Sequence, residues 1–180
     1  YMFELHDTEL IDIVPQKTHG GSMRYVLGHA GAYPISEAVI NLLSKERALG
    51  LDKASTFETF RKKVELSRVE LVNLLHGLKA EGKRIAGYGA TSKSTSILNY
   101  CGIGPDLIEY ISDTTPIKQG KFTPGMHIPV KTHEEFKTNP PDYAVLFAWN
   151  HAEEIMTKEK GFMEAGGRWI VHVPKVQVLG

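Results

Sequence analysis

Short, nearly continuous apolar runs recur through the C-terminal half of this 180-residue chain, and the clearest of them is Tyr143–Ala148. Such runs indicate parallel strands that are covered on both faces, since a strand with one solvated face would alternate apolar and polar residues. Helical patterns lie between the runs, and strands that alternate with helices are typical of α/β domains. Residues 83–180 are therefore predicted to form a doubly wound parallel sheet with helices on both faces.

The elements of this domain follow from the apolar runs and from capping residues between them. Helices are expected at Ser92–Cys101, after Thr132 and after Asn150, because Thr and Asn side chains commonly accept hydrogen bonds from a first helical turn. Strands are expected at Arg84–Gly87, Leu107–Ser112, Ile128–Val130, Tyr143–Ala148 and Trp169–Val173.

Residues 1–31 show a different pattern. Two strand-like runs, Leu10–Val14 and Met23–Leu27, are joined by a polar turn with two glycines and are predicted to form a hairpin. A hairpin alone buries too little apolar surface to be stable, so this part is expected to be the tail of a preceding domain. The chain also begins at Tyr1 within an apolar stretch, which indicates a fragment of a longer protein.

Residues 32–82 have helical spacing and are predicted to be a helical linker. Ser36 is expected to cap a helix at Glu37–Leu49. The Ser-Thr-Phe-Glu pattern from Ser55 is typical of a capping box, which would open a long helix that ends at Gly82. The basic residues of this helix are interpreted as a solvated face rather than as a binding surface.

A turn with two glycines follows the first strand of the predicted α/β domain. Gly87 and Gly89 let backbone N–H groups approach a ligand closely, and the positive end of the next helix points to the same place. Lys93 adds a cation and Ser92 a hydroxyl. Ser92 stands where the dinucleotide fingerprint G-x-G-x-x-G has its third glycine, so the pattern does not specify NAD. It predicts an anion site suited to phosphate, in preference to a merely structural turn.

Polar residues at the ends of other strands should meet at this edge, since ligands of open parallel sheets bind beyond the carboxyl ends of the strands. Asp113 lies 24 residues after Gly89, close to where dinucleotide folds place a ribose-binding acid, although capping a turn explains it equally well. Lys118 and Gln119 lie in a long polar loop whose length favours a binding role. Asn150 is interpreted first as a helix cap and second as a ligand contact.

Composition narrows the classes of function. The 21 basic and 21 acidic residues give a formal net charge of zero, which argues against a broad nucleic-acid surface. The single cysteine, Cys101, excludes an internal disulfide, and no spacing typical of a metal site or a Ser/His/Asp triad is present. No apolar segment is long enough to span a membrane and no signal peptide is visible, so a cytoplasmic location is expected.

Four blocks of the sequence resemble the C-terminal part of the sugar-nucleotide C-methyltransferases, which use S-adenosylmethionine to methylate a ring carbon of a nucleotide-linked keto-deoxysugar. The blocks occur in the family's order and cover nearly the whole chain. The resemblance implies that residues 83–180 are a Rossmann-like C-terminal domain that holds the nucleotide-diphosphate sugar, and that residues 1–31 end a methyltransferase domain. The blocks are HGGSMR at 19–24, GYGATSKSTSILNYCGI at 87–103, ISDTTPIKQGKFTPGMHIPV at 111–130 and AWN at 148–150.

The resemblance also implies where the substrate lies. The hairpin turn would lie near the sugar, the glycine turn and helix start would face the diphosphate, and Lys118 and Gln119 would come from a ligand-facing loop. With Asp113 and Asn150, which their position at the sheet edge singles out, these form the set of candidate substrate-binding residues. The set is His19, Gly20, Gly21, Ser22, Arg24, Gly87, Gly89, Ala90, Ser92, Lys93, Asp113, Lys118, Gln119 and Asn150.

Three features of the family are absent from this sequence: the cysteine-rich zinc motif, the signature for S-adenosylmethionine and the Tyr/His/Glu cluster that abstracts the proton. No catalytic residue, bound cofactor or metal is therefore expected here, and the chain should position the substrate for upstream domains of the same polypeptide. Two other interpretations remain open. One is a free-standing Rossmann-like module for NAD or another adenine nucleotide, and the other is a non-catalytic interaction domain that docks through the helix at 57–81. Neither nucleic acid nor a membrane is expected as a partner.

Overall fold

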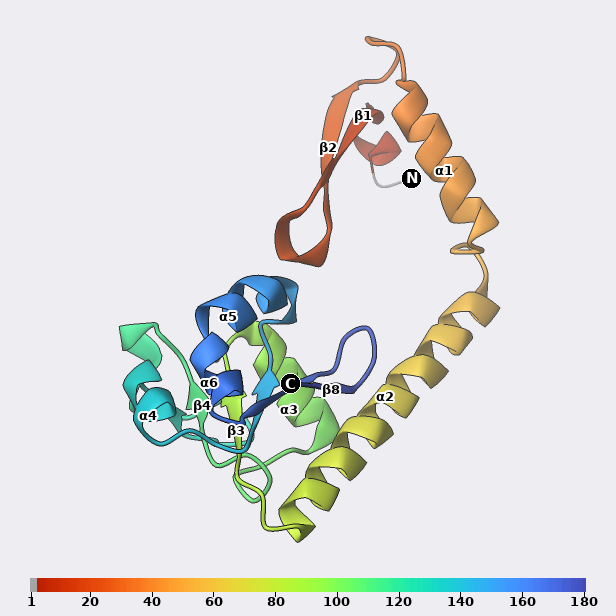
Figure 1. Ribbon diagram of the computed structural model, residues 1–180. Coiled ribbons are helices and arrows are strands. Elements are labelled where there is room, and N and C mark those ends of the chain that lie inside the picture. Colours follow the sequence, from red (N-terminus) through yellow and green to blue (C-terminus); the bar gives the residue numbers. More distant parts are fainter. Residues whose placement is uncertain (1–2) are drawn as a thin grey trace. The chain divides into compact units, whose positions relative to one another are not determined.

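The computed structural model describes residues 3–180 (Figure 1). The chain divides into two compact units, Tyr1–Lys62 and Lys63–Gly180, and each is described by itself. The division falls within the long helix α2 (Ala54–Ala80). Within the described residues, no helix is both long enough and apolar enough to cross a membrane.

The first unit contains the predicted hairpin. Its two strands pair antiparallel and run further than the sequence predicted, because a 3-10 turn with two positive-φ glycines, Gly20 and Gly21, reverses the chain within a few residues. Ile13 and Val39 are the buried apolar side chains of the described residues 3–62, so the core of this unit is small. Its elements are η1 (Glu4–His6), β1 (Thr8–Gln16), η2 (Thr18–Gly20), β2 (Ser22–His29), α1 (Glu37–Ala48) and the start of α2.

Both predicted helix caps in this unit are wrong. Ser36 directly precedes α1, but its hydroxyl donates to Oδ1 of Asp12 at 2.7 Å and makes no cap. Helix α2 begins at Ala54, so Ser55 lies inside the first turn and cannot open a capping box. The acidic residue of that pattern, Glu58, instead accepts two hydrogen bonds from Arg61. In each case the side chain forms a hydrogen bond with a polar residue that is not part of the expected cap: Ser36 with Asp12, and Glu58 with Arg61.

The second unit contains a six-stranded sheet in the order β5-β4-β3-β6-β7-β8, which confirms the predicted α/β class. All neighbouring strands are parallel except β8, which pairs antiparallel with β7. The first strand, β3, is central, and the chain builds outward from it on both sides. The strands are β3 (Ile85–Tyr88), β4 (Ile111–Ser112), β5 (Val130–Lys131), β6 (Tyr143–Leu146), β7 (Arg168–Val171) and β8 (Gln177–Leu179).

Several predicted strand limits need correction. The strand expected at Leu107–Ser112 is regular only at Ile111–Ser112, although Tyr110 already accepts a hydrogen bond from Gly87 of β3. Three of its earlier residues, Leu107, Ile108 and Tyr110, are buried outside the regular strand, and an apolar run alone does not distinguish such residues from strand. The short strand β8 was not predicted at all, since three half-exposed residues form no clear pattern.

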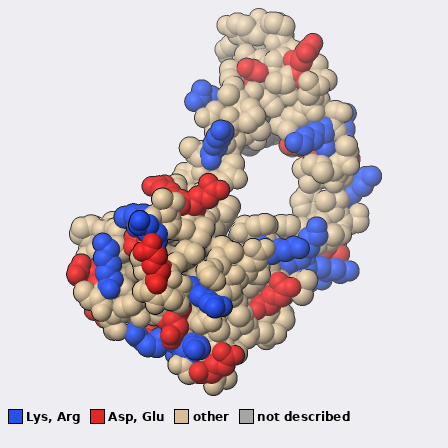
Figure 2. Space-filling view, viewed as in Figure 1, with Lys and Arg blue, Asp and Glu red and all other residues tan. Residues whose placement is uncertain are grey.

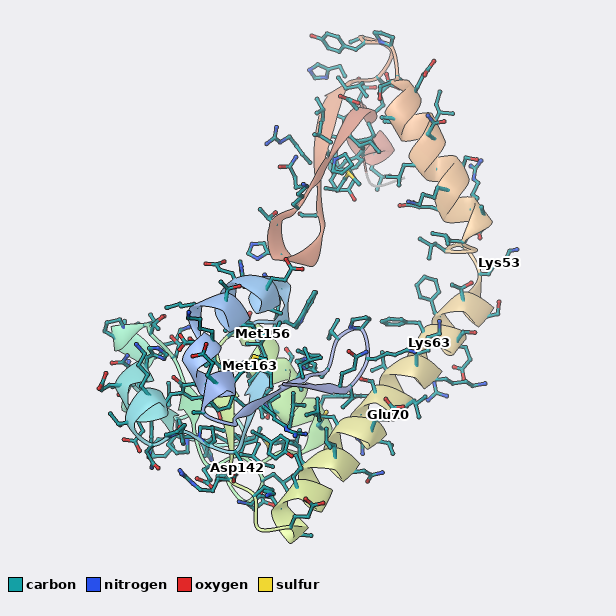
Figure 3. All side chains as sticks on the ribbon, in the orientation of Figure 1. Lys53, Lys63, Glu70, Asp142, Met156 and Met163 are labelled. Atoms are coloured by element: carbon teal, nitrogen blue, oxygen red, sulfur yellow. The ribbon has the colours of Figure 1, made fainter. Side chains whose placement is uncertain are left out.

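Helices α2 and α3 lie on one side of the sheet and α4 and α6 on the other (Figure 1), and an apolar cluster fills the space on each side. One contains Leu71 and Leu75 of α2 and Leu98 of α3, and half-buried Cys101 packs against it. The other contains Phe136 of α4 and Phe162 of α6, with Met156 and Met163 packed against it (Figure 3). The helices are α3 (Ser92–Cys101), η3 (Pro116–Lys118), α4 (His133–Thr138), η4 (Trp149–His151), α5 (Ala152–Lys158) and α6 (Lys160–Glu164).

One residue, Asp142, links the amino ends of three neighbouring strands, β3, β6 and β7. Asp142, labelled in Figure 3, lies directly before β6, and its Oδ2 accepts a hydrogen bond from the backbone N–H of Arg84 at 2.7 Å. Its carbonyl oxygen accepts from the N–H of Arg168 at the start of β7. Because β3 pairs parallel with both β4 and β6, the carboxyl ends of these three strands lie side by side at the opposite edge of the sheet.

Candidate functional site

The candidate site is built where β3, β4 and β6 end. Gly87 lies within β3, and a Cβ placed there would be 2.8 Å from Phe147 and 2.9 Å from Ile111, both fully buried. Gly89, the first residue after the strand, has φ +92°, which favours glycine. The first glycine therefore provides space in the core, and the second lets the chain turn sharply toward α3.

The turn residues Gly89, Ala90 and Thr91 use their backbone donors within the chain. The N–H of Gly89 donates to the carbonyl of Ser112 at 2.8 Å, and that of Ala90 to Oδ2 of Asp113 at 2.8 Å. The N–H of Thr91 bonds the carbonyl of Gly89 and Oγ of Ser94. These three groups shape the turn and are not free to bind an anion.

Two donors remain at the start of α3. Thr91 and Ser94 form a reciprocal capping box, in which Oγ1 of Thr91 accepts from the N–H of Ser94 at 3.1 Å. The N–H groups of Ser92 and Lys93 have no acceptor among the described residues 3–180. Since the first turn of a helix carries partial positive charge, these two groups suit an anion.

Lys93 and Asn150 meet across the gap between α3 and η4. Nζ of Lys93 donates to Oδ1 of Asn150 at 2.5 Å and lies 4.8 Å from the centre of the Trp149 ring. The prediction that Asn150 caps the following helix is wrong, because His151 directly precedes α5 and the Asn150 side chain binds Lys93. Because Lys93 is the second residue of α3, its ammonium adds a full positive charge near the start of this helix.

Asp113 is a buried connector between the turn and the long loop. It is 8% exposed, and its oxygens accept from the N–H groups of Ala90 and Thr115 and from Nζ of Lys118 at 3.1 Å. Burial alone would raise the pKa of Asp113, but hydrogen bonds from Thr115 and the Lys118 ammonium lower it below its ordinary value. Gln119 donates to the carbonyl oxygen of Asp113, so the loop is fixed to the end of β4.

A pocket of about 320 Å³ opens beside the turn, between α3 and the long loop. Ile117 and Phe122 line it and are 72% and 64% exposed, which is unusual for large apolar side chains. Sequence reasoning found the loop from its length but not these residues, because nothing local distinguishes them from core positions. The pocket is lined by Ala90, Ser94, Thr95, Ile117, Lys118, Lys121, Phe122, Thr123, Pro124 and Val130.

Tyr88, the last residue of β3, is anchored on the other face of the sheet. Its hydroxyl donates to Oε1 of buried Glu159 at 2.9 Å, and Nε2 of His133 lies 3.1 Å from the same oxygen. Burial and the bond to Glu159 raise the pKa of Tyr88 above its usual range, so the phenol keeps its proton. Burial lowers the pKa of His133, against the attraction of Glu159. This cluster fixes the strand end from which the glycine turn leaves.

His172 follows β7 at the same edge and was also missed by sequence reasoning. The residue is 4% exposed, and neither ring nitrogen has a hydrogen-bond partner among the described residues. Burial lowers its pKa to about 4, so the imidazole is neutral at pH 7. Its position in an apolar run, between Val171 and Val173, is the signal that could have identified it as a buried histidine.

The other candidate residues lie in the first unit. His19, Gly20, Gly21, Ser22 and Arg24 form the hairpin turn and the start of β2, and all five are exposed. The five residues lie close together because they are consecutive or nearly so along one tight turn. Among the described residues 3–180, no group of three or more His, Cys, Asp or Glu side chains is arranged to hold a metal ion.

Basic and acidic residues are mixed on the face of the second unit that Figure 2 shows. Figure 2 shows basic and acidic side chains interspersed over the visible face of the second unit, with no large area of one sign. The positive charge at the candidate site is therefore local, coming from the helix start and Lys93.

Comparison with known proteins identifies a family model and a relative that match this chain. Residues 17–174 match the family model of the C-methyltransferase C-terminal domain. The C-methyltransferase NovU of Streptomyces niveus is 39% identical over 179 residues, which cover 99% of this chain and 43% of that protein. The chain thus spans less than half the length of this curated relative. Both matches agree with the four sequence blocks described first, and the chain belongs to the family of C-methyltransferase C-terminal domains.

Proposed function

We propose that this chain is the substrate-holding domain of an S-adenosylmethionine-dependent C-methyltransferase that acts on a nucleotide-linked keto-deoxysugar. The observation that carries the proposal is the start of α3, where the N–H groups of Ser92 and Lys93 are unbonded within the described residues and where Lys93 also supplies an ammonium, which bonds Asn150. A diphosphate offers several charged acceptors to such a group of donors.

The order of the strands supports this position for the ligand. From the central strand β3 the sheet grows first through β4 to β5 and then, on the other side, through β6 to β7 and β8. This is the 3-2-1-4-5-6 order of doubly wound, Rossmann-like folds, which bind ligands where the direction of building reverses. The reversal lies between β3 and β6, and the residues that follow these strands include Lys93 and Asn150.

Each candidate residue then has a distinct role. Ser92 and Lys93 donate to the diphosphate, and Asn150 orients the Lys93 ammonium. Gly87, Gly89, Ala90 and Asp113 maintain the turn from which these donors project. Lys118 and Gln119 hold the long loop against the turn, so that it borders the ligand. The hairpin-turn residues His19, Gly20, Gly21, Ser22 and Arg24 are proposed to approach the sugar.

The methyl group would come from S-adenosylmethionine, which supplies it to the carbon next to the keto group of the sugar after that carbon loses a proton. The described residues do not fit this cofactor, since the Asp113 carboxylate that could receive its ribose is already bonded to Ala90, Thr115 and Lys118. We assign both the cofactor and the proton-abstracting base to upstream parts of the parent protein, and a structural zinc likewise. This domain contributes orientation of the substrate, which accelerates a reaction by reducing its entropic cost.

Calorimetric titration of the chain with uridine or thymidine diphosphate tests the proposal. A nucleoside diphosphate is expected to bind, and S-adenosylmethionine is not. Lys93→Ala should weaken diphosphate binding by about 1.5–3 kcal/mol, the scale of hydrogen bonds to charged groups. Lys137→Ala, an exposed lysine of α4, is the control and should leave the affinity unchanged. Equal affinities for the two variants would show that Lys93 does not contact the ligand.

A further inference from the structure

The second unit has the parts of a dinucleotide-binding fold but uses them differently. Asp113 directly follows β4, the strand next to the central one, and this is where such folds place the acid that binds the adenosine ribose. A ribose-binding acid needs free oxygens that accept from two hydroxyl groups. The Asp113 side chain is instead 7% exposed and is bonded within the chain.

The ammonium of Lys118 forms a hydrogen bond with the Asp113 carboxylate. Lys118 ends the 3-10 turn η3, and its Nζ donates both to Oδ2 of Asp113 at 3.1 Å and to the carbonyl of Ala90 at 2.8 Å. The ammonium therefore joins the end of β4 to the glycine turn. A ribose hydroxyl would have to displace a charged donor from a buried carboxylate, which is a poor exchange.

The glycine turn is closed to a dinucleotide for the same reason. The N–H of Ala90 donates to Oδ2 of Asp113, the same oxygen that accepts from Lys118. The N–H of Gly89 donates to the carbonyl oxygen of Ser112. The Asp113 carboxylate, which would bind the ribose of NAD, and the Ala90 N–H, which would bind its pyrophosphate, are thus hydrogen-bonded to each other.

We propose that Lys118 excludes adenine dinucleotides from this domain by occupying the Asp113 carboxylate, and so determines which class of nucleotide it accepts. The N–H groups of Ser92 and Lys93 follow two and three residues after Ala90, and neither is bonded to Asp113 or Lys118. A nucleotide sugar whose diphosphate binds there does not require a direct hydrogen bond to the Asp113 carboxylate. The sequence alone permitted NAD through Gly87, Gly89 and Asp113, and the exclusion depends on the partner that Asp113 acquires on folding.

Titration of the full chain with NAD⁺ and with ADP-ribose tests this role, using wild type, Lys118→Met and two controls. Methionine keeps most of the apolar length of the side chain and removes the ammonium. Lys121→Met changes a lysine that lines the same pocket but does not bond Asp113. Asp113→Asn combined with Lys118→Met removes the acid as well. Circular dichroism establishes that each variant is folded, and Lys118→Gln replaces Lys118→Met if that variant is not.

Wild type and Lys121→Met are expected to bind NAD⁺ and ADP-ribose no better than about 1 mM. Lys118→Met should bind ADP-ribose at least about tenfold more tightly, and the double variant should lose this gain. Tight binding of NAD⁺ by wild type, an equal gain in Lys121→Met, or no gain in a folded Lys118 variant would each overturn the proposal. Uridine diphosphate is titrated into the same samples, so failure of the diphosphate site is seen separately.

Discussion

The most direct test of the packing beneath the site is Gly87→Ala. The φ of Gly87 is ordinary, so the substitution introduces no backbone strain, and the added Cβ is the whole perturbation. That Cβ would lie 2.8 Å from Cε2 of Phe147 and 2.9 Å from Cγ1 of Ile111, closer than carbon atoms approach. Both neighbours are completely buried in the apolar cluster below α2 and α3, so neither can move into solvent.

The magnitude follows from two opposing effects. Overfilling a well-packed core by one methyl group costs about 1–3 kcal/mol. Replacing glycine by alanine also restricts the unfolded chain, which stabilises the fold by about 0.4–1 kcal/mol. We therefore expect Gly87→Ala to lower the free energy of unfolding of the second unit by about 1–2 kcal/mol.

Urea unfolding followed by tryptophan fluorescence measures this unit alone, because both tryptophans, Trp149 and Trp169, lie within it. The matched control is Gly77→Ala in α2, where a Cβ meets no atom within 4 Å. Alanine in a helix interior should stabilise by about 0.5–1 kcal/mol, so one chemical change gives opposite signs at two positions. If Gly87→Ala proved as stable as Gly77→Ala, the close packing of Phe147 and Ile111 around β3 would be refuted.

Three further outcomes are expected in the same assay. Burial lowers the pKa of His172 to about 4, from 6.5 in the unfolded chain. The neutral histidine therefore makes its full contribution to the free energy of unfolding above pH 6.5, and this free energy falls by about 3 kcal/mol as the pH drops toward 4. His172→Phe should reduce this pH dependence, and an unchanged pH profile would contradict the reasoning. Tyr88→Phe removes the donor to buried Glu159 and should cost about 1–3 kcal/mol at pH 7, whereas a neutral effect would mean that the carboxylate finds another donor. Asp113→Asn should cost a similar amount, about 1–3 kcal/mol, and should expose the Ala90 amide to hydrogen exchange; protection equal to wild type would show that Asp113 does not hold the turn.

Local pattern was enough to locate the parts of the second unit. The buried strand expected at Tyr143–Ala148, which spans Tyr143–Leu146, was predicted from an apolar run. The glycine turn after β3 and the helix from Ser92 to Cys101 were predicted from glycine spacing and a helix start. These features depend on residues within a few positions of one another, since the strand and helix repeats and the turn geometry are short-range. The prediction of an anion site at the helix start rests on the same short-range features.

The partners of the polar side chains were decided by the tertiary structure. Lys93 binds Asn150, Tyr88 binds Glu159, and Asp113 binds Ala90, each across a separation that the order of the strands closes. The sequence identified Asp113 and Asn150 as polar residues at strand ends but could not distinguish a cap, a ligand contact and a bond within the chain. A side chain that can bond several groups binds whichever one folding brings within about 3 Å, and that depends on strand order rather than on neighbours in the sequence. The sequence therefore determined which residues reach the edge of the sheet, and the fold determined which of them remain free to bind a ligand.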